Sequence, residues 1–211
     1  VVVDGLGADF EMIVQERPLV LHVDPYFDVF RRLDPRETPP SIGQMFGEPR
    51  ILAVLPSGAR PELVAGYREL VKGWQSQSHT IEVSLDSEIP RLPADRSIWL
   101  LGRENRFAEP LFRRQAGLSI DAGALGVDGQ TLPLANHTAV LMTRHPGNLE
   151  KAVGWILVDP AAALPGLRRK LPHYGKYSYL GFEGSEPANM LSGQWQDADS
   201  PLRIDLREAA D

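Results

Sequence analysis

Four short apolar runs limit the folds open to this chain more than any other feature. They are Ile51–Leu55, Ser97–Leu101, Ala139–Thr143 and Val153–Val158. Each run has five or six residues, which suits a strand better than a buried helix, and continuous apolar strands are typical of a sheet that is covered on both faces. The sequence therefore predicts a domain organised around a buried sheet.

Segments with helical character lie between some of these runs. Pro61 opens one of them at a position where its missing N–H costs nothing, and apolar residues from Leu63 to Trp74 then recur at helical spacing. Shorter helical segments are predicted at 109–115 and 148–152. This alternation of strands and helices predicts an α/β fold, specifically a Rossmann-like three-layer arrangement around a mostly parallel sheet.

One antiparallel hairpin is also expected. Residues 118–134 alternate in polarity, and Asp128-Gly129 lies near their centre. Both central residues of such a turn need positive φ, which this dipeptide tolerates well.

Residues 1–49 lack the alternation of strands and helices that the rest of the sequence shows. Phe10–Val14 and Leu19–Val23 are short apolar runs that suit a hairpin, so a short β segment is expected to precede the main fold. Prolines at 35, 39 and 40 disfavour regular structure in the segment after this hairpin. The predicted organisation is a β segment at 1–33, an extended linker at 34–49 and an α/β domain at 50–211.

Composition removes several classes of function. The chain carries 22 basic and 28 acidic residues, so its net charge of −6 argues against a nucleic-acid partner, which would need a basic face. It contains no cysteine, which excludes disulfides and thiolate metal sites. No apolar run approaches the length of a membrane span. The start at Val1 suggests a processed or partial chain. The sequence does not indicate the cellular compartment.

Motifs of known catalytic sites are missing from the sequence. None of the five histidines is followed by glutamate, so His-Glu-x-x-His is absent, as are Gly-x-Ser-x-Gly and a P-loop. A metal site assembled from His137, His145 and distant carboxylates is a lesser alternative. We therefore expect no catalytic residues, no metal ligands and no cofactor in this chain. Whether the chain is an enzyme stays undecided on this basis.

Two polar segments are candidates for binding a ligand or a partner. The first comes directly after the run at 97–101, and open α/β sheets bind ligands outside the carboxyl ends of their strands. The second brings aromatic rings and cations together, which suits a partner surface or a sugar-like or peptide ligand. The candidate residues are Arg103, Asn105, His173, Tyr174, Lys176 and Tyr177.

Two stretches of the sequence resemble a known group of proteins. They are Phe27–Pro35, and Leu171–Leu180 continuing through Glu186–Asn189 to Gly193–Trp195. Together they resemble the C-terminal region of bacterial proteins related to the gluzincin zinc metallopeptidases of the membrane-alanyl-aminopeptidase type. The resemblance implies that residues 1–33 end an upstream β-rich domain and that a zinc-bearing catalytic domain of the same polypeptide is the partner. It transfers no catalytic residue, because the zinc-binding motif is absent here.

These observations leave three functional hypotheses. The first is a non-catalytic accessory domain of a larger zinc-aminopeptidase-like protein, which serves in domain docking or substrate access. The alternative is a small-ligand-binding α/β domain that uses the carboxyl ends of its strands. The third is an independent hydrolase with an unfamiliar site. Zinc content would separate the third from the others, and a pocket lined by the candidate residues would favour the second.

Overall fold

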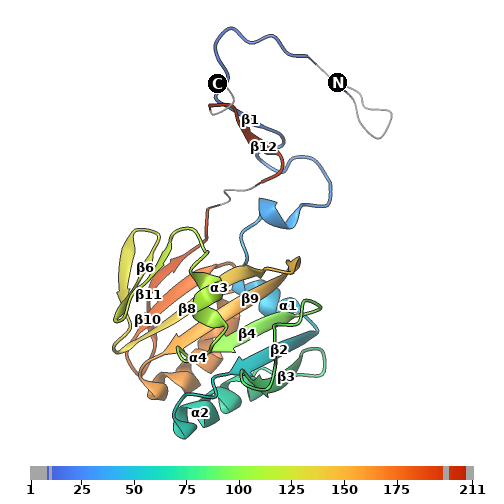
Figure 1. The fold of residues 1–211 in the computed structure, drawn as a ribbon. Helices are drawn as coiled ribbons and strands as arrows, with labels where there is room; N and C mark the ends of the chain where they lie inside the picture. The colour runs from blue at the N-terminus through green and yellow to red at the C-terminus, as the bar shows by residue number, and fades with distance from the viewer. Residues whose placement is uncertain (1–8, 10, 197–199, 208–211) are drawn as a thin grey trace. The chain divides into compact units, whose positions relative to one another are not determined.

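A computed structural model describes residues 9, 11–196 and 200–207, and the chain divides into two compact units (Figure 1). The small unit comprises residues 1–37 and 198–211, and the large unit comprises residues 38–197. Phe10, the first residue of a predicted apolar run, lies outside the described residues.

A seven-stranded sheet forms the centre of the large unit, in the order β11-β10-β8-β9-β4-β2-β3. Its strands are β2 (Arg50–Leu55), β3 (Thr80–Leu85), β4 (Ser97–Leu101), β8 (His137–His145), β9 (Asn148–Val158), β10 (Tyr179–Glu183) and β11 (Ala188–Gly193). The neighbours from β3 through β2 and β4 to β9 pair in parallel. The pairs β9–β8, β8–β10 and β10–β11 are antiparallel.

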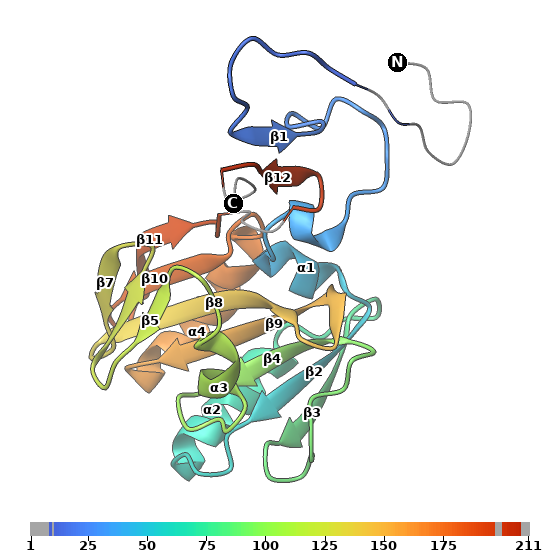
Figure 2. The same ribbon diagram turned by 45° about the horizontal axis from the view of Figure 1, so that its top comes forward.

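Shorter elements cover the two faces of this sheet. A second sheet of three antiparallel strands contains β5 (Leu118–Ile120), β6 (Ala124–Val127) and β7 (Gln130–Pro133). The α-helices are α1 (Ile42–Gly47), α2 (Pro61–Lys72), α3 (Ala108–Phe112) and α4 (Leu164–Lys170). The 3-10 helices of this unit are η2 (Ala161–Ala163) and η3 (Leu171–His173). Figures 1 and 2 show α3 on the sheet face opposite α2 and α4.

Each face of the sheet has its own apolar core. On one face, alternate strand residues such as Trp99 and Ile156 pack with the helices α1, α2 and α4. On the other face, Trp155 and Leu100 pack with α3 and with strands of the small sheet. Because side chains alternate along a strand, the continuous apolar runs supply both cores at once.

The expected Rossmann-like three-layer fold is wrong. The described residues are mostly β, with 12 strands in sheets of 7, 3 and 2, and only 20% of the structure is helical. The central sheet has mixed orientation rather than a mostly parallel one. The reason is local, because residues 118–158 and 179–193 form consecutive hairpins instead of strand–helix crossovers. A small sheet and the five-residue α3 therefore lie where a helical layer was expected.

Residues 148–152 account for part of this error. The expected helical turn is replaced by the start of β9, which pairs directly with the end of β8 from Asn148 onward. Pro146-Gly147 makes a connection too short for a helix, so the chain reverses at once into the antiparallel ladder. The predicted hairpin at Asp128-Gly129 is confirmed, since both residues have positive φ, 50° and 78°, between β6 and β7.

The segment expected to be an extended linker contains short helices. Residues Pro35–Glu37 form the 3-10 helix η1 in the small unit, and α1 begins at Ile42 in the large unit. Backbone N–H groups of Ile42 and Gly43 donate to the carbonyls of Tyr177 and Gly175, at 3.0 and 2.7 Å. The start of α1 is thus held by the loop that precedes β10.

The small unit contains a two-stranded ribbon. Strand β1 (Val20–His22) pairs antiparallel with β12 (Arg203–Asp205), which joins segments far apart in the sequence. The predicted hairpin partner of this strand was the run ending at Val14, but residues 11–14 form no strand. Local spacing could not reveal the true partner, because it lies about 180 residues further along the chain.

Candidate functional site

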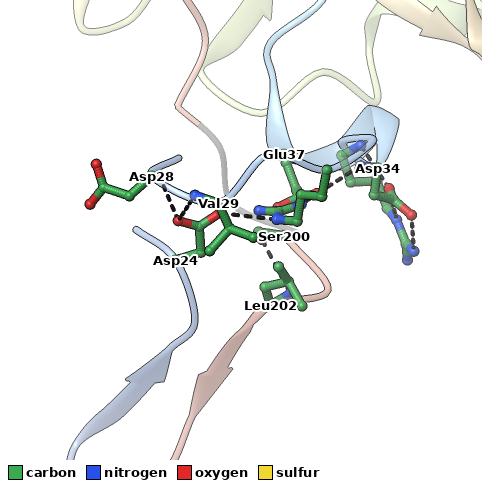
Figure 3. Close-up of polar contacts among 9 residues, drawn as sticks. Asp24, Asp28, Val29, Asp34, Glu37, Ser200 and Leu202 are labelled. Carbon is green, nitrogen blue, oxygen red and sulfur yellow. Dashed lines mark hydrogen bonds and ion pairs between the residues drawn. The ribbon is translucent and has the colours of Figure 1, made fainter. Parts of the chain in front are cut away.

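A polar frame closes residues 24–31 of the small unit, here called the aromatic loop (Figure 3). The carboxylate of Asp24 accepts hydrogen bonds from the backbone N–H groups of Asp28 and Val29, at 2.7 and 3.2 Å. Its second oxygen accepts one from Nε of Arg31, at 3.0 Å. Asp24 itself has a φ of 52°, a conformation that aspartate adopts more readily than most residues. One side chain therefore fixes both ends of the loop.

Arg31 joins this carboxylate to a second one. Its two terminal nitrogens each donate to one oxygen of Glu37, at 2.7 Å in both cases, which is the strong bidentate geometry of a guanidinium with a carboxylate. Glu37 is buried and also accepts the backbone N–H of Asp34, at 2.6 Å. These contacts anchor the aromatic loop to η1.

The electrostatics of the frame favour its charged state. Hydrogen bonds from Arg31, and next from Asp34, lower the pKa of Glu37, while desolvation acts in the opposite direction. Desolvation also opposes ionisation of Asp24, but hydrogen bonds from Val29, Arg31 and Asp28 outweigh it and lower its pKa. The hydrogen bonds that Arg31 donates to Glu37 in turn raise the pKa of Arg31. All three groups are therefore ionised at neutral pH.

The apolar side chains of the aromatic loop remain exposed. Tyr26 is 82% exposed and Phe30 is fully exposed, while Phe27 and Val29 are each at least half exposed. Loops that are held rigidly and present aromatic rings to solvent lose little entropy when they bind, and aromatic residues dominate the energetic centres of protein interfaces. The arrangement has the properties of a docking surface.

The ribbon beside this loop in the sequence is also apolar and open. Val20 on β1, Val23 directly after β1 and Ile204 on β12 are all exposed. Each of the two strands has one hydrogen-bonding edge without a neighbouring strand in the described structure. An isolated two-stranded ribbon is marginally stable in water, and open edges readily accept a further strand.

In the large unit, the sequence-predicted pair Arg103 and Asn105 occupies the carboxyl end of β4, but the two side chains differ in role. Asn105 is 2% exposed and its Nδ2 donates to the Val54 carbonyl at 2.8 Å, so it ties β2 to the loop after β4. Arg103 is exposed and donates to the Asp121 carbonyl at 3.1 Å. Arg103 is therefore the one of the pair that a ligand could reach.

The second predicted group lies at the opposite end of the sheet. His173, Tyr174, Lys176 and Tyr177 precede β10, whose first residue pairs with Leu141 in the middle of β8. The ring of Tyr174 packs on Tyr177 and Phe182, with centroids 5.9 and 5.5 Å away, and both tyrosines lie against the helical face of the core. His173 and Lys176 are exposed. The structure does not bring this group together with Arg103.

A pocket of about 390 Å³ does exist at the carboxyl ends of β4 and β9. Its ionisable lining residues include Arg60, Arg103, Glu104, His137 and Asp159, and leucines contribute to its apolar part. Asp159 accepts the backbone N–H of Asn136 at 2.8 Å. Nδ1 of His137 donates to the Ala135 carbonyl at 2.7 Å.

Burial has a marked effect on one residue of this pocket. It raises the pKa of Tyr67, and the nearby charge of Glu104 raises it further. The tyrosine therefore stays a neutral hydroxyl at physiological pH. Two arginines and two acidic side chains around an apolar floor suit recognition of a ligand that carries both charges.

Asp86 is a residue that sequence reasoning missed. It is 2% exposed, and its two oxygens accept backbone N–H groups of Ser57 at 2.8 Å and Arg106 at 3.1 Å. Desolvation opposes its ionisation, but hydrogen bonds from Ser57 and Arg106 outweigh it and lower the pKa of Asp86. Asp86 and Asn105 thus tie together the segments after β2, β3 and β4, at the end of the sheet where an open sheet would usually receive its ligand.

The lesser alternative of a metal site at His137 and His145 does not fit the structure. These histidines lie at the two ends of the nine-residue strand β8, roughly 26 Å apart at the usual rise per residue. One ion cannot contact both. Across the described residues, no group of three or more histidines and acidic residues is placed to hold a metal ion.

In the sequence, the aromatic loop is marked only by the resemblance of Phe27–Pro35. The sequence does contain a local signal for its frame, since Asp24-Pro25 precedes an aromatic run and Arg31 follows it. Aspartates at the start of a turn often accept hydrogen bonds from the backbone N–H groups of that turn. The contribution of Glu37 has no such local signal.

Comparisons with known proteins add no assignment. No family model matches this chain, and no curated protein gives a significant match to it. Of the helices that the structure describes, none is long and apolar enough to cross a membrane.

Proposed function

We propose that this chain is a non-catalytic accessory region of a larger zinc-aminopeptidase-like protein, and that the aromatic loop docks it onto a neighbouring folded domain. The observation that carries the proposal is the frame of Asp24, Arg31 and Glu37, which holds Tyr26 and Phe30 in place while leaving both exposed. Exposed aromatic side chains on an ordered loop are costly in water unless a partner covers them.

The chemistry of the surface favours a protein domain over a lipid surface. Residues 24–37 carry four acidic and three basic side chains, so they lack the cationic excess that attracts anionic membranes. The open strand edges of the ribbon favour a partner that offers further β-strands. The link to the aminopeptidase-like group rests on the resemblance of Phe27–Pro35 and of the segment from Leu171 to Trp195.

Site-directed cross-linking tests this proposal. A photo-reactive amino acid is placed at position 30, in the protein as its gene encodes it, and cross-linked residues are mapped by mass spectrometry. We expect cross-links to residues of a folded domain outside 1–211. The matched control is position 83, an exposed valine on β3, which should not reach that domain. Cross-links from position 30 only to residues within 1–211, or none at all, would contradict docking.

A second candidate function concerns the pocket at the ends of β4 and β9. Its guanidiniums at Arg60 and Arg103, and its carboxylates at Glu104 and Asp159, favour a small zwitterionic ligand such as a free amino acid or dipeptide. Calorimetric titration with a set of amino acids and dipeptides tests this. Binding should weaken about tenfold in Arg103→Ala, as expected for loss of a charge-assisted hydrogen bond, and stay unchanged in Arg68→Ala on the exposed side of α2. Equal affinity of the two variants would rule the pocket out.

A further inference from the structure

A second hollow in the large unit, the arginine-rimmed groove, has a volume of about 1060 Å³. It lies between residues 89–95, which come after β3, the helix α3 and the β8–β9 turn at 145–147. Its walls are mainly apolar and include Ile89, Leu92, Phe107 and Leu111. The groove is separate from the pocket at the strand ends, since the two share no lining residue.

Hydrogen bonds from side chains to backbone carbonyls hold the walls of this groove in place. Nε of Arg106 donates to the Asp86 carbonyl at 2.8 Å and a terminal nitrogen donates to the Ile89 carbonyl, so this arginine is used to fix one wall. Nδ2 of Asn148 donates to the Ala94 carbonyl at 2.8 Å and fixes another. Prolines at 90, 93, 110 and 146 restrict the remaining backbone. A ligand would therefore meet a preformed surface.

The rim of the groove carries cations that lack partners. Arg91 and Arg114 are exposed, and within the described part of the chain neither has a side-chain hydrogen bond or ion pair. The acidic residue on the rim, Asp95, is already paired with Arg96 at 2.9 Å. The groove is thus locally positive in a chain whose net charge is −6.

His145 adds a donor at the groove. It is 3% exposed, and the backbone N–H of Gly147 donates to its Nδ1 at 3.0 Å. Because Nδ1 accepts, the proton of the neutral ring is on Nε2, and burial lowers the pKa and keeps the ring neutral. Nε2 is itself buried and has no hydrogen-bond partner among the described atoms. An unsatisfied buried donor is costly, and an acceptor from a ligand would relieve that cost.

We propose that the arginine-rimmed groove binds an extended peptide segment in which carboxylates alternate with apolar side chains. The apolar walls receive the apolar side chains, and Arg91 and Arg114 pair with the carboxylates. Peptide binding exposes the buried Nε2 of His145, which then donates to a peptide carbonyl or carboxylate. A nucleic acid fits less well, because only two free cations are present among the described residues of the groove to meet a chain of phosphates. This site is independent of the aromatic loop and of the pocket at the strand ends.

Fluorescence anisotropy with a labelled peptide of alternating glutamate and leucine or phenylalanine tests the proposal. We expect saturable binding that weakens with added salt, and at least about tenfold weaker binding of a matched peptide with glutamine in place of glutamate. The double variant Arg91→Glu and Arg114→Glu should bind the acidic peptide at least about tenfold more weakly. The control Arg68→Glu makes the same kind of charge reversal on α2 and should bind like the unaltered protein.

His145→Phe keeps a ring of similar size but removes the Nε2 donor, together with the Nδ1 acceptor of Gly147. It should weaken binding about fivefold while the protein stays folded by circular dichroism. Equal binding of acidic and neutral peptides, or unchanged affinity in the double arginine variant, would overturn the proposal. Laurate is the final probe, because a fatty acid shares the carboxylate and the apolar chain. Tight binding of laurate with no binding of the peptide would also overturn it.

Discussion

Both units contain an aspartate that accepts two backbone N–H groups, but the apolar residues around it are exposed in one unit and buried in the other. In the small unit, Asp24 accepts two backbone N–H groups and closes a loop whose apolar side chains face solvent. In the large unit, Asp86 also accepts two backbone N–H groups, but it joins the ends of strands whose side chains pack into an apolar core. A buried aspartate that closes a turn therefore says nothing by itself about function. What matters is whether the apolar residues around it are already covered.

The largest expected loss of stability comes from a substitution in the apolar core of the large unit. Trp155 is buried in the core beside α3, with its Nε1 donating to the Gly102 carbonyl at 2.8 Å. Trp155→Ala should destabilise the large unit by about 3–5 kcal/mol, the usual cost of deleting a buried aromatic side chain. Urea unfolding followed by circular dichroism measures this. A loss below about 1 kcal/mol would mean that packing does not hold the large unit together.

Asp86→Ala should have the next largest effect. It leaves the N–H groups of Ser57 and Arg106 without their acceptor at the edge of the core, which should cost about 2–4 kcal/mol. Asp24→Ala, the equivalent change in the small unit, should leave the urea transition of the large unit unchanged. If both substitutions shifted that transition equally, the two units would not be energetically independent and the comparison would fail.

The sequence predicted the parts of the large unit that depend on local pattern. The strands at 51–55 and 97–101, the helix from Pro61 and the Asp128-Gly129 turn are all present. The predicted fold class was wrong because an apolar run does not show whether a hairpin or a helical crossover connects it to the previous strand. The run at 153–158 also gave no sign that β9 begins at Asn148. A run of apolar residues shows burial on both faces but not the direction of its neighbours.

The candidate site was predictable only in part. Arg103 could be placed at a strand end from its position after the run at 97–101, and it does line a pocket. Asn105 has the same sequence context, yet it points into the protein to bond Val54. The pairing of β1 with β12, and of Arg31 with Glu37, depends on tertiary contacts that no periodicity encodes.

A third prediction concerns the frame of the aromatic loop. Arg31→Ala should release the amides of Asp28 and Val29, so their hydrogen exchange should accelerate, while exchange in β4 and β9 stays slow. Arg36→Ala is the control, because the Arg36 guanidinium donates to the neighbouring Asp34 carboxylate at 2.9 Å. Equal exchange in the two variants would mean that Arg31 does not close the loop.

The same frame should respond to acid in a defined direction. Asp24 and Glu37 have lowered pKa values in the folded protein, so they stabilise the loop above their ordinary values of about 3.9 and 4.3. That contribution is lost as the pH falls through the lower folded-state values. Exchange at Asp28 and Val29, corrected for its intrinsic pH dependence, should stay constant from about pH 7 to 5 and accelerate below about pH 4. Acceleration near pH 6 would point to a histidine instead.

The smallest expected effect on stability is the one that bears most directly on function. Phe30→Ser removes a fully exposed ring that the described structure does not use for packing, so the free energy of unfolding should change by no more than about 0.5 kcal/mol. The same substitution should reduce binding of an apolar fluorescent dye and abolish cross-linking from position 26 to a neighbouring domain. Val83→Ser, on the exposed side of β3, is the matched control and should leave both signals intact. If Phe30→Ser instead unfolded the chain, the ring would belong to a core, and the aromatic loop would be a structural element and not a docking surface.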